Sequence, residues 1–230
     1  KEELAYIEDG GGLVKSSKDK NKFKWAQIAE LMKYRQIWAI CIGKFASTSA
    51  LYFFLTWFPT YLIEERHLTM VKVGIFAVLP FIGATGGVLL AGFIADLMIR
   101  RGFSLSFSRK LPLVVGSALG MSIMLVNFTD SNEVCIALLT IAFFAQGIAS
   151  SSWAAVSEIA PKELIGLTGG VTSLAANIGG IVTPIVIGQI LHVTGSFAYA
   201  FWFIGGVALI GTLSYSLLLG KIYRIELKTR

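Results

Sequence analysis

The sequence predicts an all-α membrane protein that crosses the bilayer six times. Of its 230 residues, 55% are hydrophobic and only 15% are charged, and the mean hydropathy is +0.71. Soluble globular domains carry about 25% charged residues, so that class of protein is excluded. The apolar residues form six runs long enough to span a bilayer as helices. The net charge of +6 lies between these runs, which is typical of membrane orientation rather than nucleic-acid binding.

The polar start of the chain, residues 1–36, is expected to be a cytoplasmic linker with short surface helices. A first helix is expected over residues 4–8, ended by the glycines at 10–12 and followed by a basic linker at 15–24. Apolar residues then recur at helical spacing over residues 25–34, which indicates a helix lying along the membrane surface.

The first predicted span, residues 37–62, would be ~39 Å long as a helix, enough to cross a bilayer with some tilt. Its only charged residue is Lys44, and a charge inside a membrane is costly and usually functional. On a helix Lys44, Ser47, Thr48 and Tyr52 share one sector of ~140°. This stripe predicts an anion ligand that faces a cavity. The alternative is that Lys44 snorkels to the cytoplasmic interface.

Five further spans follow from the hydropathy pattern. They are expected at residues 73–99, 111–128, 134–160, 166–192 and 198–219. All Lys and Arg residues except Lys44, Arg66 and Lys72 lie in residues 1–36, 100–110, 161–165 and 220–230. By the positive-inside rule these segments are cytoplasmic, and the chain ends in a cytoplasmic tail at 220–230.

Small residues four apart occur in three of the spans and predict close packing between helices. The pairs are Gly83 with Gly87, Gly116 with Gly120 and Gly166 with Gly170. Hinge action is the alternative. Cys41 and Cys135 lie in apolar runs and are expected to be plain packing residues, so no disulfide, metal site or cofactor is predicted.

The fourth span carries a polar face. On one continuous helix Gln146, Ser150, Trp153 and Ser157 would share a face only ~60° wide. Hydrogen-bonding groups beside a flat indole suit a polyol ligand. The alternative is hydrogen bonding between helices. Glu158, near the cytoplasmic end, is expected to pair at the interface or in a loop rather than to carry a proton.

The fifth span also has a polar side. It is formed by Gly169, Gly170, Ser173, Asn177, Gly180 and Pro184. Asn177 in mid-span needs a partner, either a substrate hydroxyl or a neighbouring helix. The third and sixth spans lack such stripes. We therefore expect the first, fourth and fifth spans to face inward and the third and sixth to be lipid-facing supports.

The second span ends in GFIADLMIRRG, residues 92–102. This resembles the G-x-x-x-D-R-x-G-R-[RK] loop motif of the major facilitator superfamily, matching at Gly92, Asp96, Arg100 and Arg101, whereas the motif's inner arginine and glycine are replaced. The resemblance implies a conformational latch, in which Asp96 at the helix end can pair with Arg100 or Arg101. The alternative is an ordinary solvated loop pair, which contributes little to stability.

Other stretches are similar to the anion:cation symporter branch of that family. They are EELAYIEDGGGLV, GKFASTSALYFFLTWFPTYL, GFIADLMIRRGFSLSFSRK and LIGLTGG with GGIVTPIVIG. This branch includes bacterial galactonate, glucarate and hexuronate permeases and, distantly, vesicular glutamate carriers. The resemblance covers the whole chain but only the second half of such transporters. It implies the C-terminal bundle, two three-helix inverted repeats, in a bacterial inner membrane, with an N-terminal six-helix half as partner.

The resemblance also implies a site and an activity. A galactonate-type site would use Lys44, Ser150 and Trp153. Galactonate carriers have glutamine in place of Lys44, hexuronate carriers have lysine, and an asparagine of galactonate carriers is Ser173 here. Proton-coupling acids and an arginine clamp would belong to the other half. The implied activity is proton-coupled symport of a sugar acid by alternating access. The alternatives are an aromatic or dicarboxylate anion carrier, or a non-transporting six-helix scaffold or sensor.

Overall fold

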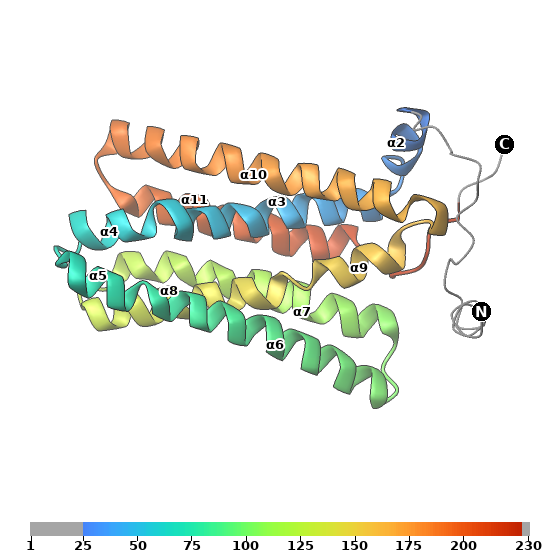
Figure 1. Cartoon of the computed structure of the whole chain (residues 1–230), viewed down its shortest axis with the longest axis horizontal. Helices are drawn as coiled ribbons and strands as arrows, with labels where there is room; N and C mark the ends of the chain where they lie inside the picture. Colours follow the sequence, from blue (N-terminus) through green and yellow to red (C-terminus); the bar gives the residue numbers. More distant parts are fainter. Residues whose placement is uncertain (1–24, 227–230) are drawn as a thin grey trace, which may run out of the picture.

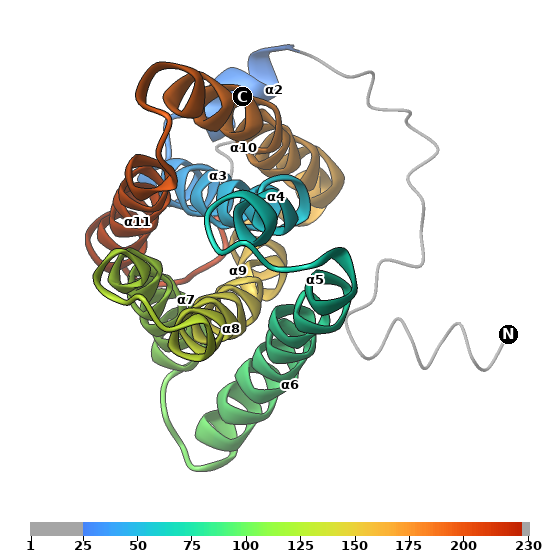
Figure 2. The same cartoon turned by 90° about the vertical axis from the view of Figure 1, so that its left-hand side faces the viewer.

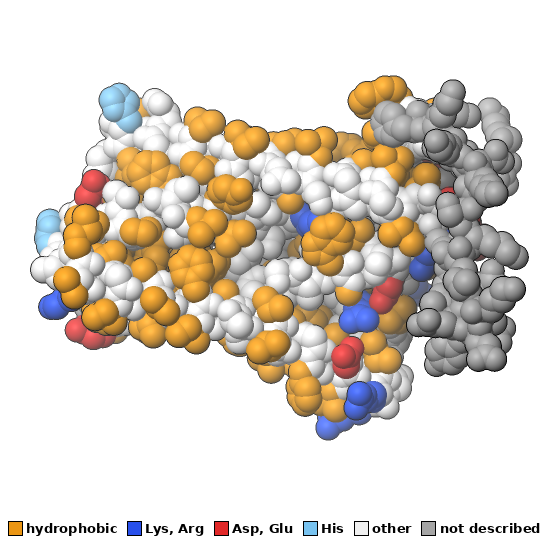
Figure 3. All heavy atoms as spheres, viewed as in Figure 1, with side chains coloured by type: hydrophobic (Ala, Val, Ile, Leu, Met, Phe, Trp, Pro, Cys, Tyr) orange, Lys and Arg blue, Asp and Glu red, His pale blue; other side chains and the backbone are white. Residues whose placement is uncertain are grey.

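The structure, a computed structural model, describes residues 25–226 as a bundle of long helices (Figure 1). Six helical segments are long and apolar enough to cross a membrane, as predicted. Hydrophobic side chains are spread over the face shown in Figure 3, and most of the charged side chains visible there lie toward its two ends. The helix expected at residues 4–8 and the linker at 15–24 lie outside the described residues.

The first two spans are each divided into two helices. After the short helix α2 (Trp25–Leu31), the segments are α3 (Arg35–Thr56) with α4 (Phe58–Glu64), and α5 (Met70–Phe76) with α6 (Val78–Arg100). Pro59 and Pro80 each lie in the first turn after a division. Because proline has no N–H and its ring crowds the carbonyl four residues earlier, a continuous helix would be strained there.

The remaining spans also depart from single regular helices. They are α7 (Leu105–Gly120) with the 3-10 helix η1 (Met121–Phe128), α8 (Asn132–Ala149) with α9 (Ser152–Ile159), the turn η2 (Lys162–Leu164) with α10 (Ile165–Thr194), and α11 (Phe197–Leu213) with the π-helical turn η3 (Ser214–Leu218). Segment 134–160, predicted as one helix, is thus two helices.

Helix α3 forms the centre of the bundle. Figure 2 shows α3 and α4 between α10 and α11 on one side and α8 and α9 on the other. Aromatic side chains fill one end of this core, where the rings of Phe54 and Phe143 stack with centroids 4.2 Å apart. Figure 2 shows α11 and α7 along one side of the bundle, with α8 between α7 and α6. The spans of α7 and α11 are those that were expected to be supports.

Glycines allow two of the helix pairs to approach closely. A Cβ at Gly87 of α6 would overlap the Phe144 carbonyl of α8, and a Cβ at Gly116 of α7 would lie 2.6 Å from the Ala149 nitrogen. At Gly87 and Gly116, one member of each of the first two glycine pairs, the predicted close packing between helices is therefore confirmed. It does not hold for Gly166 and Gly170, where no described atom lies within 4 Å of such a Cβ.

The segment after η3 folds back onto the bundle instead of extending away from it. Ile222 and Ile225 are buried among residues of α3, α7 and α9. The Ile225 N–H donates to the Ile159 carbonyl at the end of α9 over 2.9 Å, and the Ser106 hydroxyl donates to the Ile222 carbonyl over 3.0 Å. Up to residue 226, the expected tail is therefore part of the packed structure.

The contact between α6 and α8 gives a first prediction. Gly87→Val should lower the free energy of unfolding by about 1–3 kcal/mol, because the new side chain has no room against the backbone of α8. Thermal unfolding of the purified protein in detergent measures this effect. Gly74→Ala is the matched control, since nothing lies within 4 Å of its Cβ. Equal stability of both variants would contradict the close contact.

Candidate functional site

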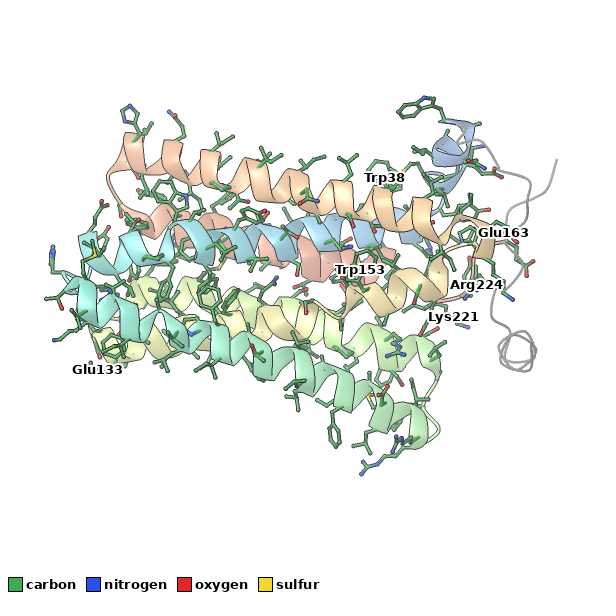
Figure 4. The ribbon with its side chains drawn as sticks, viewed as in Figure 1. Trp38, Glu133, Trp153, Glu163, Lys221 and Arg224 are labelled. Carbon is green, nitrogen blue, oxygen red and sulfur yellow. The ribbon has the colours of Figure 1, made fainter. Side chains whose placement is uncertain are left out.

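The ammonium group of Lys44 lies against the indole of Trp153. The distance from Lys44 Nζ to the ring centroid is 3.9 Å. Lys44, in the middle of α3, is only 7% exposed, whereas Trp153 is 57% exposed. Figure 4 shows Trp153 on α9, near the middle of the bundle's length. The indole thus covers a charge that would otherwise meet the apolar interior.

The division between α8 and α9 places Trp153. Three consecutive serines occur there, and two of their hydroxyls donate to the preceding turn, Ser150 to the Gly147 carbonyl over 2.7 Å and Ser151 to the Ile148 carbonyl over 3.1 Å. Such bonds compete with the backbone ladder of a helix. The fourth span is therefore not one continuous helix, since Gln146 lies before the division and Trp153 after it. That Gln146, Ser150, Trp153 and Ser157 share one face stays a prediction.

Helix α10 packs against the six-membered ring of the indole. A Cβ at Gly169 would lie 3.4 Å from Cζ3 of Trp153, so a larger side chain would press on the ring. Farther along α10, a Cβ at Gly180 would lie 2.7 Å from the Tyr52 ring of α3. Trp153 and Tyr52 therefore both lie against glycines of the fifth span, which the sequence placed on its polar side.

Gln146 and Ser47 bind one another. The Gln146 amide donates to the Ser47 hydroxyl over 2.8 Å and also to the Ser47 carbonyl. Gln146 thus forms the hydrogen bond between helices that was the alternative to a polyol site, and this bond links α8 to α3. A cavity of about 20 Å³ adjoins the pair and is also lined by Ser117, which is room for about one water molecule.

The remaining candidate residues lie along α3 and α10. Thr48 and Ser173 are partly exposed, and Asn177 is exposed. The Asn177 amide donates to the Ser173 carbonyl over 2.9 Å. Asn177 thus finds a partner on its own helix, which neither sequence alternative foresaw.

The acidic residue of the loop motif has a different partner from the one expected. Asp96 Oδ1 lies 4.0 Å from Nη1 of Arg109 on α7, and Arg109 Nε donates to Glu158 Oε1 of α9 over 3.0 Å. Arg100 and Arg101 are exposed at the end of α6. The predicted pairing of Asp96 with either of them is therefore wrong, because Arg109 on the next helix lies closer to the carboxylate.

The sequence pattern of the Major Facilitator Superfamily matches residues 6–184. The chain belongs to this superfamily. It is 44% identical over 229 residues to the D-galactonate transporter of Escherichia coli O6:H1, covering 98% of this chain and 53% of that protein. It is 41% identical to the probable galactarate/D-glucarate transporter GudP of Bacillus subtilis, covering 98% and 50%. It is 31% identical to the hexuronate transporter of Bacillus subtilis, covering 80% and 44%.

The chain spans about half the length of the curated relatives it matches. That proportion is consistent with the expected C-terminal half of a facilitator-superfamily protein. The family and the six spans establish a multi-pass membrane protein. The relatives are named transporters, so the chain is grouped with transporters rather than with enzymes. Among residues 25–226 no three His, Cys, Asp or Glu side chains gather as metal ligands.

The ion pairs of Arg109 were not predicted from the sequence. Arg109 lies in the stretch SFSRK, which was used for the resemblance but was given no role. A basic pair at the start of a span is also typical of membrane orientation. Only the packing of α7 against α6 and α9 distinguishes Arg109 from Arg100 and Arg101. Glu158, expected to pair rather than to carry a proton, does form an ion pair.

The pairing of Arg109 gives a second prediction. Arg109→Gln should destabilise the protein by about 1–3 kcal/mol, because it leaves the partly buried Glu158 carboxylate without its cation. The double variant Arg109→Gln/Glu158→Gln should recover part of this loss. Asp96→Asn should have a smaller effect, since its side chain is 65% exposed and 4.0 Å from Arg109. Thermal unfolding of the wild type and these three variants tests the order, and a double variant less stable than Arg109→Gln alone would contradict it.

Proposed function

We propose that this chain is the C-terminal half of a proton-coupled symporter that carries a sugar acid by alternating access. The observation that carries the proposal is the buried ammonium of Lys44 beneath the half-exposed indole of Trp153. The names of its relatives, which refer to galactonate, galactarate, glucarate and hexuronate, support this class of substrate. All of these are polyhydroxylated carboxylates.

Lys44 supplies the charge that would bind the substrate carboxylate. An ammonium inside a membrane span is costly, and a cation–π contact offsets only about 0.5–2 kcal/mol of that cost. The contact with Trp153 favours an anion ligand over snorkelling, because it holds Nζ against a side chain of a neighbouring helix. An arriving carboxylate would complete the neutralisation of this charge.

The neighbours of Lys44 suit the rest of a sugar acid. The exposed indole of Trp153 offers a flat apolar surface for the C–H face of a polyol. Hydroxyl contacts are assigned to the polar residues nearby: Ser47, Thr48, Tyr52, Gln146, Ser150, Ser173 and Asn177. Gln146 and Asn177 would have to give up their present hydrogen bonds to take part. Ser150 is exposed and keeps acceptor capacity at its oxygen.

Proton coupling is assigned to the other half of the transporter. The acidic side chains within the described membrane spans all lie near the ends of those spans; they are Asp96, Glu133, Glu158 and Glu163. Substrate would bind between the two halves near the middle of the membrane, and access would alternate as the halves rock around it. The motif residues Gly92, Asp96, Arg100 and Arg101, with Arg109, would act at the cytoplasmic latch between conformations.

The role of Lys44 gives the central prediction. In the transporter complete with its N-terminal half, Lys44→Met should weaken sugar-acid binding ~10-fold to 200-fold, because a hydrogen bond to a charged group is lost. Lys44→Gln should lose less if hydroxyl contacts dominate, and should shift preference toward galactonate-type acids. Calorimetric titration with galactonate, glucarate and glucuronate measures both effects.

The matched control for Lys44 is Lys162→Met, which removes an exposed lysine at the end of the bundle. Expression and unfolding temperature are compared first, so that a folding defect is recognised. Unchanged affinity of Lys44→Met for every acid would contradict the proposal and return Lys44 to the snorkelling interpretation.

The proposed location is the bacterial inner membrane, with residues 1–36 and the chain end at 220–230 in the cytoplasm. Single cysteines at Asp130 and Thr194, introduced with Cys41 and Cys135 replaced by serine, should react with an impermeant maleimide added to intact cells. A cysteine at Phe107 should react only after the cells are opened. The reverse pattern of labelling would show that the orientation is inverted.

A further inference from the structure

A second hollow lies between the second and fourth spans, away from Lys44. It is a groove of about 580 Å³ between α5 with the start of α6 and the first half of α8. Its lining includes Lys72, Phe76, Leu79, Glu133, Ala137 and Ile141. This volume lies in the range of sites that bind small molecules.

The polarity of the groove changes along its length. Lys72 and Glu133 lie in the first turns of α5 and α8, where two membrane spans begin. Deeper in the same spans the walls become apolar, at Leu79 on one side and Ile141 on the other. At ~1.5 Å per residue these walls continue for ~10–12 Å beyond the charged residues. A charged mouth above an apolar channel matches the shape and polarity of a lipid.

The groove faces away from the proposed substrate site. On α8, Glu133, Ala137 and Ile141 lie ~140–180° around the helix from Gln146, which binds Ser47 of α3. All three are exposed. Figure 4 shows Glu133 at one end of the bundle, with Lys221 and Arg224 at the other. The mouth of the groove is thus at the membrane boundary opposite the basic end.

Two opposite charges, those of Lys72 and Glu133, line this mouth without forming an ion pair with each other. Within residues 25–226 neither Lys72 nor Glu133 forms an ion pair, and Glu133 Oε2 accepts the Ser131 hydroxyl over 2.7 Å. A ligand that satisfies both must carry an anion and a cation close together. It must also carry an alkyl chain long enough to fill the apolar walls.

We propose that the groove binds a phospholipid with a zwitterionic, primary-ammonium headgroup, as in phosphatidylethanolamine. The phosphate binds Lys72, the ammonium donates to Glu133, and one acyl chain lies along Leu79 and Ile141. A choline headgroup has no N–H to donate to Glu133, and a glycerol headgroup offers no cation to it. The groove therefore selects the ethanolamine headgroup.

The test measures lipid retention by the delipidated transporter in detergent, using native mass spectrometry. Phosphatidylethanolamine, phosphatidylcholine and phosphatidylglycerol with identical acyl chains are titrated separately. The wild type should bind the ethanolamine lipid about tenfold more tightly than the other two. Lys72→Gln should weaken binding of all three, and Glu133→Gln should abolish the preference for ethanolamine over choline. Equal wild-type affinities, or a preference that survives Glu133→Gln, would overturn the proposal.

Two further variants separate the groove from general lipid adhesion. Ala137→Trp fills the groove from an exposed position, so the fold should be kept, which an unchanged unfolding temperature verifies. Its retention of the ethanolamine lipid should fall about tenfold or more. Lys162→Gln, at the opposite end, should leave retention unchanged. If Ala137→Trp retains this lipid as the wild type does, the groove is not the binding site.

Discussion

The buried charge of Lys44 has to be covered by protein groups, and three helices meet around it to do so. Helix α3 carries the ammonium into the apolar bundle, α9 places the Trp153 indole over it, and α10 approaches through Gly169 to support the ring. A lipid chain could not replace the indole, because it has no electron-rich face to attract a cation. The local arrangement of the first, fourth and fifth spans is consistent with this single electrostatic requirement.

The short helix α9 is fixed at both of its ends. Before it, the hydroxyls of Ser150 and Ser151 donate to the Gly147 and Ile148 carbonyls, in addition to the backbone N–H groups that these carbonyls accept. At its other end, Glu158 binds Arg109 of α7, and the Ile159 carbonyl accepts the N–H of Ile225 from the returning chain end. The position of Trp153 therefore depends on contacts with α7 and with residues 220–226, far from the indole itself.

Hydropathy alone determined the six spans, because a lipid environment leaves few alternatives to long apolar helices. The same reasoning identified Lys44 as a charge at costly depth, and Trp153 as a candidate on the fourth span. The glycines at Gly83, Gly87 and Gly116 were also recognised as close-packing positions. These features depend on composition and on the spacing of nearby residues, and both can be read directly from the sequence.

Only the tertiary structure decided which partner each polar group takes. Gln146 binds Ser47 on another helix, Asn177 bonds within its own helix, and Asp96 lies near Arg109 instead of its neighbours in sequence. Helical periodicity assigns a side chain to a face, but it does not state which helix packs there or where serines interrupt the ladder. Hydrogen bonds and ion pairs act over a few ångströms, so their partners were set by the packing of helices distant in sequence.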